Sequence, residues 1–452
     1  MPTAELATPA RACAYAVLRR VFEQDAFADR AFYAEATGLT PRDRALAMTL
    51  AYGTVQRRAT LDHVAARLSS RPPDELDPPL RAALELGLYQ LLLLDGIPEH
   101  AAVHESVQLA KRHAHGGAGL VNAVLRRASR EGRAILDGLS DATPEGAAVL
   151  HSVPLWLAEL WWQERGAAEA RALLAQVNRP AESALRVNPL VASTDEAQRE
   201  LTELGVPSCR IPELPDGLVL EAPFDVHGSS LWARGAVMGQ SRGSMRVGQA
   251  LGAAPGEQVL DLCAAPGAKT TQLAAQMDDR GSLIAVERHP GRARALRRTL
   301  QRMQVDCAAV RIADAAAVGR SGVSYDRVLV DPPCSGLGTL QSRPDLRWRT
   351  SPERIRALAL LQARILRAGA AVTAPGGTLV YSVCTISRAE GEQVVETFLD
   401  ERPEFSPEPV DGAGARPWLQ LTPHRDGTDG FFIARLRRDR AVGFQRSPVA
   451  DR

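Results

Sequence analysis

Two cysteines stand just past the ends of two predicted strands, where their thiols could take part in covalent chemistry. Cys334 follows the apolar stretch at 327–331, and Cys384 follows the one at 378–382. Ligands of an open parallel sheet bind at the carboxyl ends of its strands, so we expect both thiols to face one site. A thiolate adds reversibly to the electron-poor carbon 6 of a pyrimidine, and the addition makes carbon 5 nucleophilic.

A cysteine thiol must lose its proton before it can add to a pyrimidine in this way. Its pKa is about 8.5, and a nearby cation or the amino end of a helix lowers it. Lys269 and the helix predicted to open at Gly267 are the groups available for this. The alternative, which describes most cysteines, is that both are small buried hydrophobes. That alternative is our interpretation of Cys263 and Cys307.

The stretch 259–273 is typical of a strand, a turn of small residues and a helix that opens at Gly267. Small residues let a ligand approach the backbone, and the helix start offers unpaired N–H groups and a positive dipole end. An anion, a carboxylate or a ribose would fit there. The spacing of the glycines matches neither the dinucleotide-binding nor the P-loop fingerprint. Lys269 is, with Lys111, one of only two lysines among 54 basic residues, which indicates that the turn needs a compact ammonium.

Carboxylates follow or end three further strands. Glu287 ends the second predicted strand, where it could accept hydrogen bonds from both hydroxyls of a ribose held over the first turn. Asp314 lies just beyond the third strand and could sit over an adenine edge. Asp331 ends the fourth strand. Together with the turn, these residues predict a ligand that contains adenosine.

Strands and helices alternate from residue 258 onward, which predicts an α/β domain with a parallel, doubly wound, Rossmann-like sheet. The predicted strands are 258–263, 282–287, 308–312, 327–331 and 378–382. One helix is expected to have Ser351 as its N-cap and Pro352 in its first turn, and to stop at Gly369. Its predicted apolar face consists of Ile355, Leu358, Leu361 and Ile365.

The chain before this sheet differs in character. Residues 10–138 show helical periodicity throughout, whereas 139–240 mix short helices with proline and glycine and place Arg186 in a probable strand. We therefore expect four parts. They are an all-α domain at 1–138, a linker and small α+β subdomain at 139–240, the α/β domain at 241–440 and a tail at 441–452.

Composition excludes several classes of protein. The six cysteines form no Cys-x-x-Cys pair, which favours a reducing cytoplasm. The chain has no signal-peptide core and no run of about 18 apolar residues that could span a membrane. His100 and His104 stand four apart without a further clustered ligand, so we expect no metal.

The net charge is only +1, and the basic residues gather in two clusters, which are usually solvated helix faces. The first cluster comprises Arg288, Arg292, Arg294, Arg297, Arg298 and Arg302, and the second comprises Arg343, Arg347, Arg349, Arg354 and Arg356.

Five motifs, in order along the chain, resemble those of the RNA cytosine-5 methyltransferases. They are 261–270, 331–336, 343–345 with Trp348, 382–384 and 427–432. The helical region resembles the RNA-binding antitermination factor NusB, notably at 50–55, 86–91 and 121–127. In this combination the chain resembles, over nearly its full length, the Sun/Fmu (RsmB) subgroup, which methylates a cytosine in small-subunit (16S) ribosomal RNA.

The resemblance implies a cytoplasmic, monomeric enzyme that uses S-adenosyl-L-methionine and binds small-subunit ribosomal RNA. It implies that Cys384 is the nucleophile, that Cys334 assists release of the methylated product, and that Asp331 and Lys269 belong to the catalytic group. The implied cofactor contacts are Cys263, Ala264, Ala265, Pro266, Gly267, Ala268, Lys269, Glu287, Asp314 and Asp331. The resemblance and the arginine clusters together predict that RNA is held mainly through its phosphates.

The sequence departs from the family pattern in three places. Ala268 stands where a second glycine is usual, Glu287 stands where aspartate is usual, and 240–244 follow the expected Gln-Asp pattern only loosely.

Three alternatives predict different chemistry. A DNA cytosine-5 methyltransferase would use Cys334 as its nucleophile, but the second cysteine, Cys384, and the lack of a large insertion between the last motifs disfavour it. An RNA-binding factor without turnover would have no reason to retain both cysteines and Lys269. The missing glycine fingerprint disfavours an NAD-dependent oxidoreductase.

Overall fold

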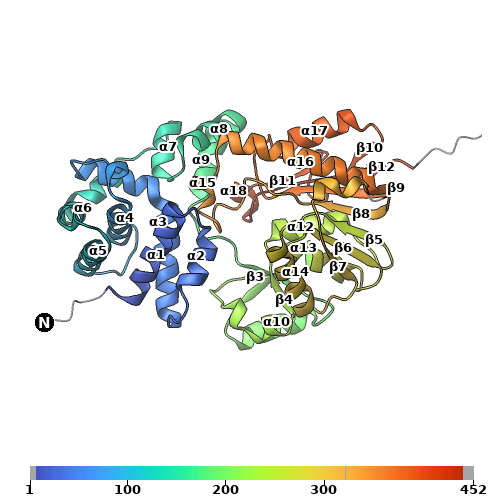
Figure 1. Ribbon diagram of the computed structural model, residues 1–452, viewed down its shortest axis with the longest axis horizontal. Helices are drawn as coiled ribbons and strands as arrows, with labels where there is room; N and C mark the ends of the chain where they lie inside the picture. The colour runs from blue at the N-terminus through green and yellow to red at the C-terminus, as the bar shows by residue number, and fades with distance from the viewer. Residues whose placement is uncertain (1–6, 321, 441–452) are drawn as a thin grey trace, which may run out of the picture. The chain divides into compact units, whose positions relative to one another are not determined.

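The computed structural model describes residues 7–320 and 322–440 (Figure 1). The predicted tail at 441–452 lies outside them. The chain divides into two compact units, each built from more than one stretch of sequence. The first unit combines Met1–Pro180 with Leu340–Ser351, and the second combines Ala181–Thr339 with Pro352–Arg452.

The first unit is helical, as the periodicity of residues 10–138 predicts. Its long helix α3 begins after Thr40, whose side chain accepts a hydrogen bond from the backbone N–H of Asp43 at 3.2 Å. Leucine, valine and alanine side chains from α1, α3, α4, α5 and α6 form one continuous core. The elements are α1 (Pro9–Glu23), α2 (Ala28–Glu35), α3 (Pro41–Leu68), η1 (Pro73–Glu75), α4 (Pro78–Leu92), α5 (Glu99–His113), α6 (Ala118–Asp137), α7 (Pro144–Leu150), α8 (Leu155–Arg165), α9 (Ala167–Gln176) and α15 (Leu346–Arg349).

Helix α15 comes from the segment Leu340–Ser351, far later in the sequence than the rest of this unit. The Trp348 indole N–H donates to the carbonyl of Val55 at 2.7 Å, and the Asp345 carboxylate accepts from the N–H of Ala28 at 3.2 Å. The region 139–240 likewise serves both units, because α7, α8 and α9 belong to the first and the strands that follow belong to the second.

The expectation that the second arginine cluster is a solvated, RNA-facing surface is wrong for Arg347. Its side chain is fully buried, and its guanidinium donates only to protein oxygens. These acceptors are the carbonyls of Gln56, Ser152, Val177 and Leu340 and the side-chain oxygen of Asn178, at 2.9–3.3 Å. Ser152 and Leu340 lie in loops and Val177 lies at the end of α9, so their carbonyls lack helical partners. The planar fork of an arginine can satisfy several such carbonyls at once.

We predict that Arg347→Ala lowers the free energy of unfolding by about 3 kcal/mol or more, because buried oxygens lose their donors. Urea unfolding followed by tryptophan fluorescence measures the change. Arg356→Ala is the control: Arg356 forms only an exposed pair with Glu353 at 2.9 Å, so its loss should cost less than about 0.5 kcal/mol. Equal effects of the two substitutions would show that the buried contacts do not stabilise the helical unit.

The second unit contains two sheets. The smaller is antiparallel with strand order β2-β3-β1-β4, and helix α10 packs on it. Arg186 lies in its strand β1, as predicted. The elements of this part are β1 (Ala184–Val187), α10 (Thr194–Glu203), β2 (Ser208–Ile211), β3 (Leu214–Leu220), η2 (Val226–Gly228), α11 (Ser230–Ala233) and β4 (Val237–Gly239).

The larger sheet has the order β10-β12-β9-β8-β5-β6-β7, and β11 also pairs with β12. The five strands from β5 to β9 are parallel, as predicted. Each overlaps its predicted range, and β9 begins five residues earlier than predicted. Strands β10, β11 and β12, which had no sequence prediction, add an antiparallel edge. The strands are β5 (Gln258–Asp261), β6 (Ser282–Glu287), β7 (Ala308–Ile312), β8 (Tyr325–Val330), β9 (Thr373–Val383), β10 (Phe405–Glu408), β11 (Leu419–Leu421) and β12 (Phe431–Arg438).

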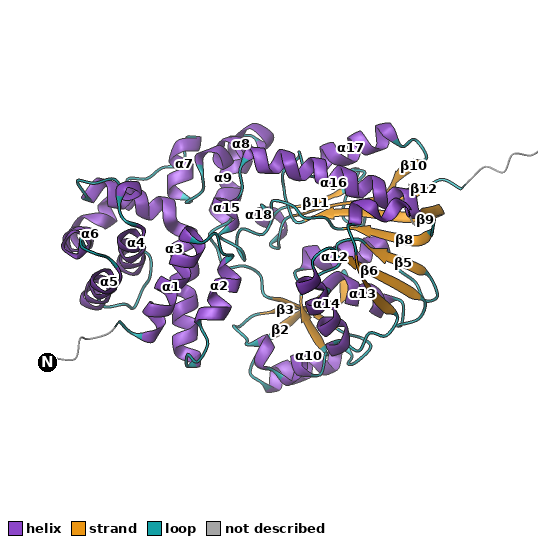
Figure 2. Cartoon of the chain, viewed as in Figure 1, coloured by secondary structure: helices purple, strands orange, loops and turns teal. Residues whose placement is uncertain are grey.

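Helices cover both faces of this sheet (Figure 2). Successive side chains of a strand alternate between the faces, so Val380 packs with α12, α13 and α14, while Leu379 and Tyr381 pack with α16 and α17. The helical elements are α12 (Arg242–Leu251), α13 (Ala268–Gln276), α14 (Pro290–Arg302), η3 (Ala315–Arg320), α16 (Pro352–Val372), α17 (Glu392–Glu401) and α18 (Pro423–Asp426). In the described part of the chain, no helix is long and apolar enough to cross a membrane.

The prediction that Gly369 stops its helix is wrong, because α16 continues through it to Val372. Gly369 is buried, and a Cβ there would lie 2.8 Å from Cγ2 of Val330 on the sheet. The glycine therefore allows close packing of helix on strand, which a one-dimensional pattern cannot distinguish from a stop signal.

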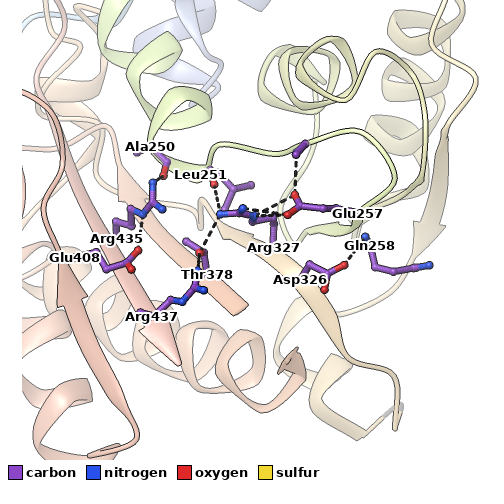
Figure 3. Close-up of polar contacts among 11 residues, drawn as sticks. Ala250, Leu251, Glu257, Gln258, Asp326, Arg327, Thr378, Glu408, Arg435 and Arg437 are labelled. Carbon is purple, nitrogen blue, oxygen red and sulfur yellow. Dashed lines mark hydrogen bonds and ion pairs between the residues drawn. The ribbon is translucent and has the colours of Figure 1, made fainter. Parts of the chain in front are cut away.

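A set of polar contacts joins the amino ends of β5 and β8 to the middle of β9 (Figure 3). Arg327 on β8 donates to both carboxylate oxygens of Glu257, at 3.0 and 3.1 Å, and to the hydroxyl of Thr378 on β9 at 3.1 Å. Arg437 on β12 donates to the same hydroxyl at 3.1 Å. These contacts do not involve the carboxyl ends of the parallel strands.

Candidate active site

The predicted site residues lie at the carboxyl ends of neighbouring strands of the larger sheet. The adjacent strands β9, β8, β5, β6 and β7 are parallel, so their carboxyl ends meet on the same side. Cys384 follows β9, and Asp331 and Cys334 follow β8. The turn from Cys263 follows β5, Glu287 ends β6 and Asp314 follows β7. The chain reverses its strand order between β5 and β8, and such a switch point is where open α/β sheets bind ligands.

The turn after β5 is fixed by a buried carboxylate. The Thr270 hydroxyl on α13 donates to Asp261 at the end of β5 at 2.7 Å, and burial raises the pKa of Asp261 to about 6. Gly267 precedes the helix with φ +112°, a conformation that favours glycine. Ala268 is the first residue of α13, and helical backbone needs no glycine there, so this departure from the family pattern is compatible with the turn.

Lys269 forms an ion pair with Asp331 across the switch point, with 2.7 Å between Nζ and Oδ2. The second oxygen of Asp331 accepts from the hydroxyl of Ser382 on β9 at 2.8 Å. The ammonium also lies 5.3 Å from the ring centre of Phe431. Burial alone would lower the pKa of Lys269, but the charge and hydrogen bond of Asp331, with the nearby Cys384, outweigh it and raise the pKa. The lysine therefore stays charged beside the thiols.

The two predicted thiols lie in contact. The sulfur atoms of Cys334 and Cys384 are 3.3 Å apart, and the N–H of Gly338 donates to the carbonyl of Cys384 at 3.1 Å. The hydrogen bond to the Cys384 sulfur and burial raise the pKa of the Cys334 thiol well above its usual range. Cys334 therefore keeps its proton and can donate it to the sulfur of Cys384.

Cys263 and Cys307 pack against the hydrophobic clusters on either face of the sheet, as expected. Burial raises the pKa of both thiols, that of Cys307 to about 12. Neither cysteine therefore supplies a reactive thiolate near neutral pH.

The ribose-binding candidate Glu287 is 4% exposed and already has protein partners. One oxygen accepts from the N–H of His289 at 2.8 Å, and the other forms an ion pair with Arg292 at 3.5 Å. Arg292 also donates to the carbonyl of Ala265 in the turn at 2.6 Å, so it joins the loops after β5 and β6. Asp314 is exposed, and its carboxylate accepts from the N–H of Ala316 at 3.0 Å.

From the sequence, Arg292 was predicted only as a member of a basic cluster. No role in the site was predicted for Arg186, Gln240 or Glu390. Buried Arg186 donates to Gln240 at 2.8 Å and to Thr271 on α13 at 2.7 Å, and thereby supports the cofactor turn from the small sheet. Buried Gln240 thus makes internal contacts and does not offer its side chain to RNA. Glu390 is buried behind the two cysteine loops. A charged residue inside an apolar stretch was a sequence signal for Arg186 alone. Glu390 lies between Arg388 and Glu392, and Gln240 is uncharged, so neither had such a signal.

Within the described residues, no group of three or more histidine, cysteine, aspartate or glutamate side chains could hold a metal ion.

A doubly wound sheet with a ligand site at its switch point is the architecture of Rossmann-like domains, and matches to known families identify the class as methyltransferase. A family model described as 16S rRNA methyltransferase RsmB/F matches residues 248–437, and the NusB family matches 8–130. A third model, a ferredoxin-like domain of RsmF/B-like methyltransferases, matches 153–227.

Whole-chain relatives agree. The probable ribosomal RNA small subunit methyltransferase B of Synechocystis sp. is 38% identical over 95% of this chain and 99% of its own length. Ribosomal RNA small subunit methyltransferase B of Thermus thermophilus is 37% identical over 88% and 89%. The crystal structure of PH0851 superposes with a TM-score of 0.82 at 26% identity, over 96% of this chain and all of that one. The chain belongs to the RsmB/F family of 16S rRNA methyltransferases, which confirms the resemblance and the predicted fold class.

We predict that Gly267→Ala lowers the free energy of unfolding by at least about 1–2 kcal/mol, because an L-residue is strained at positive φ. A Cβ there would also lie 2.8 Å from Cδ1 of Leu296. Gly291→Ala in α14 is the control, since the nearest atom to its Cβ would be 3.8 Å away, and it should stabilise by about 0.5–1 kcal/mol. Urea unfolding of both variants measures these changes. An unchanged free energy of unfolding in Gly267→Ala would show that the turn does not require glycine at this position.

Proposed function

We propose that the protein methylates carbon 5 of a cytosine in 16S ribosomal RNA, with S-adenosyl-L-methionine as methyl donor and a covalent adduct on Cys384. The observation that carries the proposal is the 3.3 Å contact between the sulfurs of Cys334 and Cys384 at the ligand-binding edge of the sheet. One thiol can serve as nucleophile while the other handles a proton beside it.

The residues at this edge fit the cofactor, in keeping with a family of S-adenosylmethionine-dependent methyltransferases. The Glu287 carboxylate is suited to accept hydrogen bonds from ribose hydroxyls, and the Asp314 carboxylate from an adenine amino group. The turn at 263–269 presents backbone groups to the remainder of the cofactor. Asp331 completes the set. When bound, S-adenosylmethionine supplies an electrophilic methyl group.

Two observations support Cys384 as the nucleophile. The charged Lys269 lies close enough to interact with Cys384, while Cys334 is the thiol that holds its proton. The thiolate of Cys384 would add to carbon 6, and the electron pair of the carbon 5–carbon 6 double bond would move to carbon 5. Carbon 5 would then take the methyl group from the sulfonium, with S-adenosylhomocysteine as the leaving group. The product is released when the carbon-5 proton leaves and the bond from carbon 6 to sulfur breaks. Cys334 could assist by taking that proton or by protonating the departing sulfur, and its raised pKa favours the second role.

Asp331 and Lys269 act as a unit. The carboxylate, held by Ser382, fixes the ammonium through a 2.7 Å contact, and the ammonium favours the thiolate form of Cys384. A DNA-methyltransferase mechanism would instead need Cys334 as the attacking thiolate, which its raised pKa opposes.

RNA binding is proposed for the NusB-like helices and for the exposed members of the first arginine cluster. Arg288, Arg294 and Arg298 are exposed on and beside α14 and suit phosphate contacts. We further propose that the enzyme acts in the cytoplasm as a monomer. Deleting 1–138 is a poor test of RNA binding, since it would remove the partners of the segment Leu340–Ser351.

We predict that Glu287→Ala weakens S-adenosylmethionine binding by about 1–3 kcal/mol, because the ribose hydroxyls lose their acceptor. Isothermal titration calorimetry measures the change. Glu396→Ala on the exposed face of α17 is the control and should bind as the wild type does. Unchanged affinity of the Glu287 variant would exclude this residue from the cofactor site.

We predict that Cys384→Ala abolishes methyl transfer, because carbon 5 is too weakly nucleophilic without the adduct. Cys334→Ala should instead stall after methylation and leave RNA attached to the protein. A denaturing gel with radiolabelled RNA should show a slow protein–RNA band for Cys334→Ala that disappears in the double variant. A band with Cys384→Ala would reverse the two roles.

A further inference from the structure

A buried carboxylate lies directly behind the two thiols. Glu390, in the loop between β9 and α17, is fully buried. Its Oε1 accepts from the N–H of Ser335 at 2.8 Å and from Nε2 of Gln362 at 2.9 Å. Its Oε2 accepts from the hydroxyls of Ser335 and, at 3.4 Å, of Thr385. Both oxygens of the carboxylate therefore have two donors.

These donors come from the two loops that carry the cysteines. Ser335 directly follows Cys334, and Thr385 directly follows Cys384. The hydroxyls of Ser335 and Thr385 also contact each other at 2.9 Å. One side chain thus holds both loops at the residue next to each thiol.

Glu390 and its partners are themselves held in place. Gln362 on α16 donates to the carbonyl of Pro333 at 2.9 Å, on the other side of Cys334 from Ser335. The Tyr381 hydroxyl on β9 donates to the backbone carbonyl of Glu390 at 2.5 Å and lies 3.3 Å from Oε1 of Gln362. A buried network in which nearly every polar group has a partner restricts movement of its members.

We infer that Glu390 is a positioning residue for methyl transfer: by binding Ser335 and Thr385 together, its carboxylate sets the spacing between the thiols of Cys334 and Cys384. The effect on catalysis rests on the proposed function, whereas the effect on thiol spacing does not. Glu390 does not contact the reacting atoms in this scheme and acts through the two loops.

The carboxylate has a property that a neutral side chain lacks. It only accepts hydrogen bonds, so it can satisfy an N–H, an amide NH₂ and two hydroxyls at once. In Glu390→Gln, the new NH₂ can face only the hydroxyls of Ser335 and Thr385, which would have to reverse and accept. Glu390→Ala removes all four acceptor contacts. The two substitutions should therefore give a graded loss.

Thiol spacing can be measured without RNA or cofactor. The full-length protein is equilibrated with reduced and oxidised glutathione, so that two cysteine thiols and one oxidised glutathione give one protein disulfide and two reduced glutathiones. Mass spectrometry quantifies the Cys334–Cys384 disulfide, and the equilibrium constant is the effective concentration of one thiol at the other. Glu390→Ala should lower this effective concentration by about tenfold or more, and Glu390→Gln by less.

The kinetic measurement uses the same variants with 16S ribosomal RNA and S-adenosylmethionine. We expect kcat to fall by up to about 100-fold in Glu390→Ala, while the RNA KM and cofactor affinity stay within about twofold. Glu396→Gln, the same chemical change at an exposed site, is the control for both measurements. If Glu390→Ala does not fold, Glu390→Gln, which keeps the size of the side chain, gives the comparison.

The outcomes separate the inference from the proposed function. An effective thiol concentration within about twofold of wild type in the folded variants would overturn the positioning role. A looser thiol pair with unchanged kcat would overturn its link to methyl transfer. A wild-type enzyme that does not methylate RNA, combined with looser thiols in the variants, would contradict the proposed function and still support Glu390 as the residue that sets the spacing.

Discussion

Strands β8 and β9 run parallel and pair Val330 with Tyr381, so the two segments that leave them start side by side. Cys334 and Cys384 lie only a few residues beyond this pair, and their sulfurs meet at 3.3 Å. The same pairing places Asp331 where Ser382 and the lysine of the β5 turn can both reach it. Other parts of the second unit stabilise this pairing. Helices cover the two faces of the larger sheet, and Arg327 joins the amino ends of β5 and β8.

The parts of the site that a sequence can predict are those that follow from strand order. Cys384, Asp331 and Glu287 each follow or end an apolar stretch, and parallel strands carry such residues to one edge. The turn at 259–273 was predictable for a similar reason, because its small residues and helix start are local signals. The five parallel strands, the helical first region and the Arg186 strand were accordingly found as expected.

The features that could not be predicted depend on contacts between distant parts of the chain. Arg347 has the charge and helical setting of a surface residue, and only the carbonyls of remote loops make its burial favourable. Glu390 gains its partners from α16 and from the segment after β8, which no local pattern reveals. Gly369 resembled a stop signal because its packing partner, Val330, lies on another element. The short edge strands β10 and β11 have too few residues to establish a period.

The segment Leu340–Ser351 also has a consequence for biosynthesis. A ribosome adds about 5–20 residues per second, so this segment is made on the order of ten seconds or more after the first helices have emerged. Until then the carbonyls that accept from Arg347 and Trp348 lack these donors, and the helical unit lacks helix α15. By the time the segment arrives, the strands through β8 and their cofactor turn have been synthesised. A nascent chain therefore completes its amino-terminal unit only after most of its catalytic half exists.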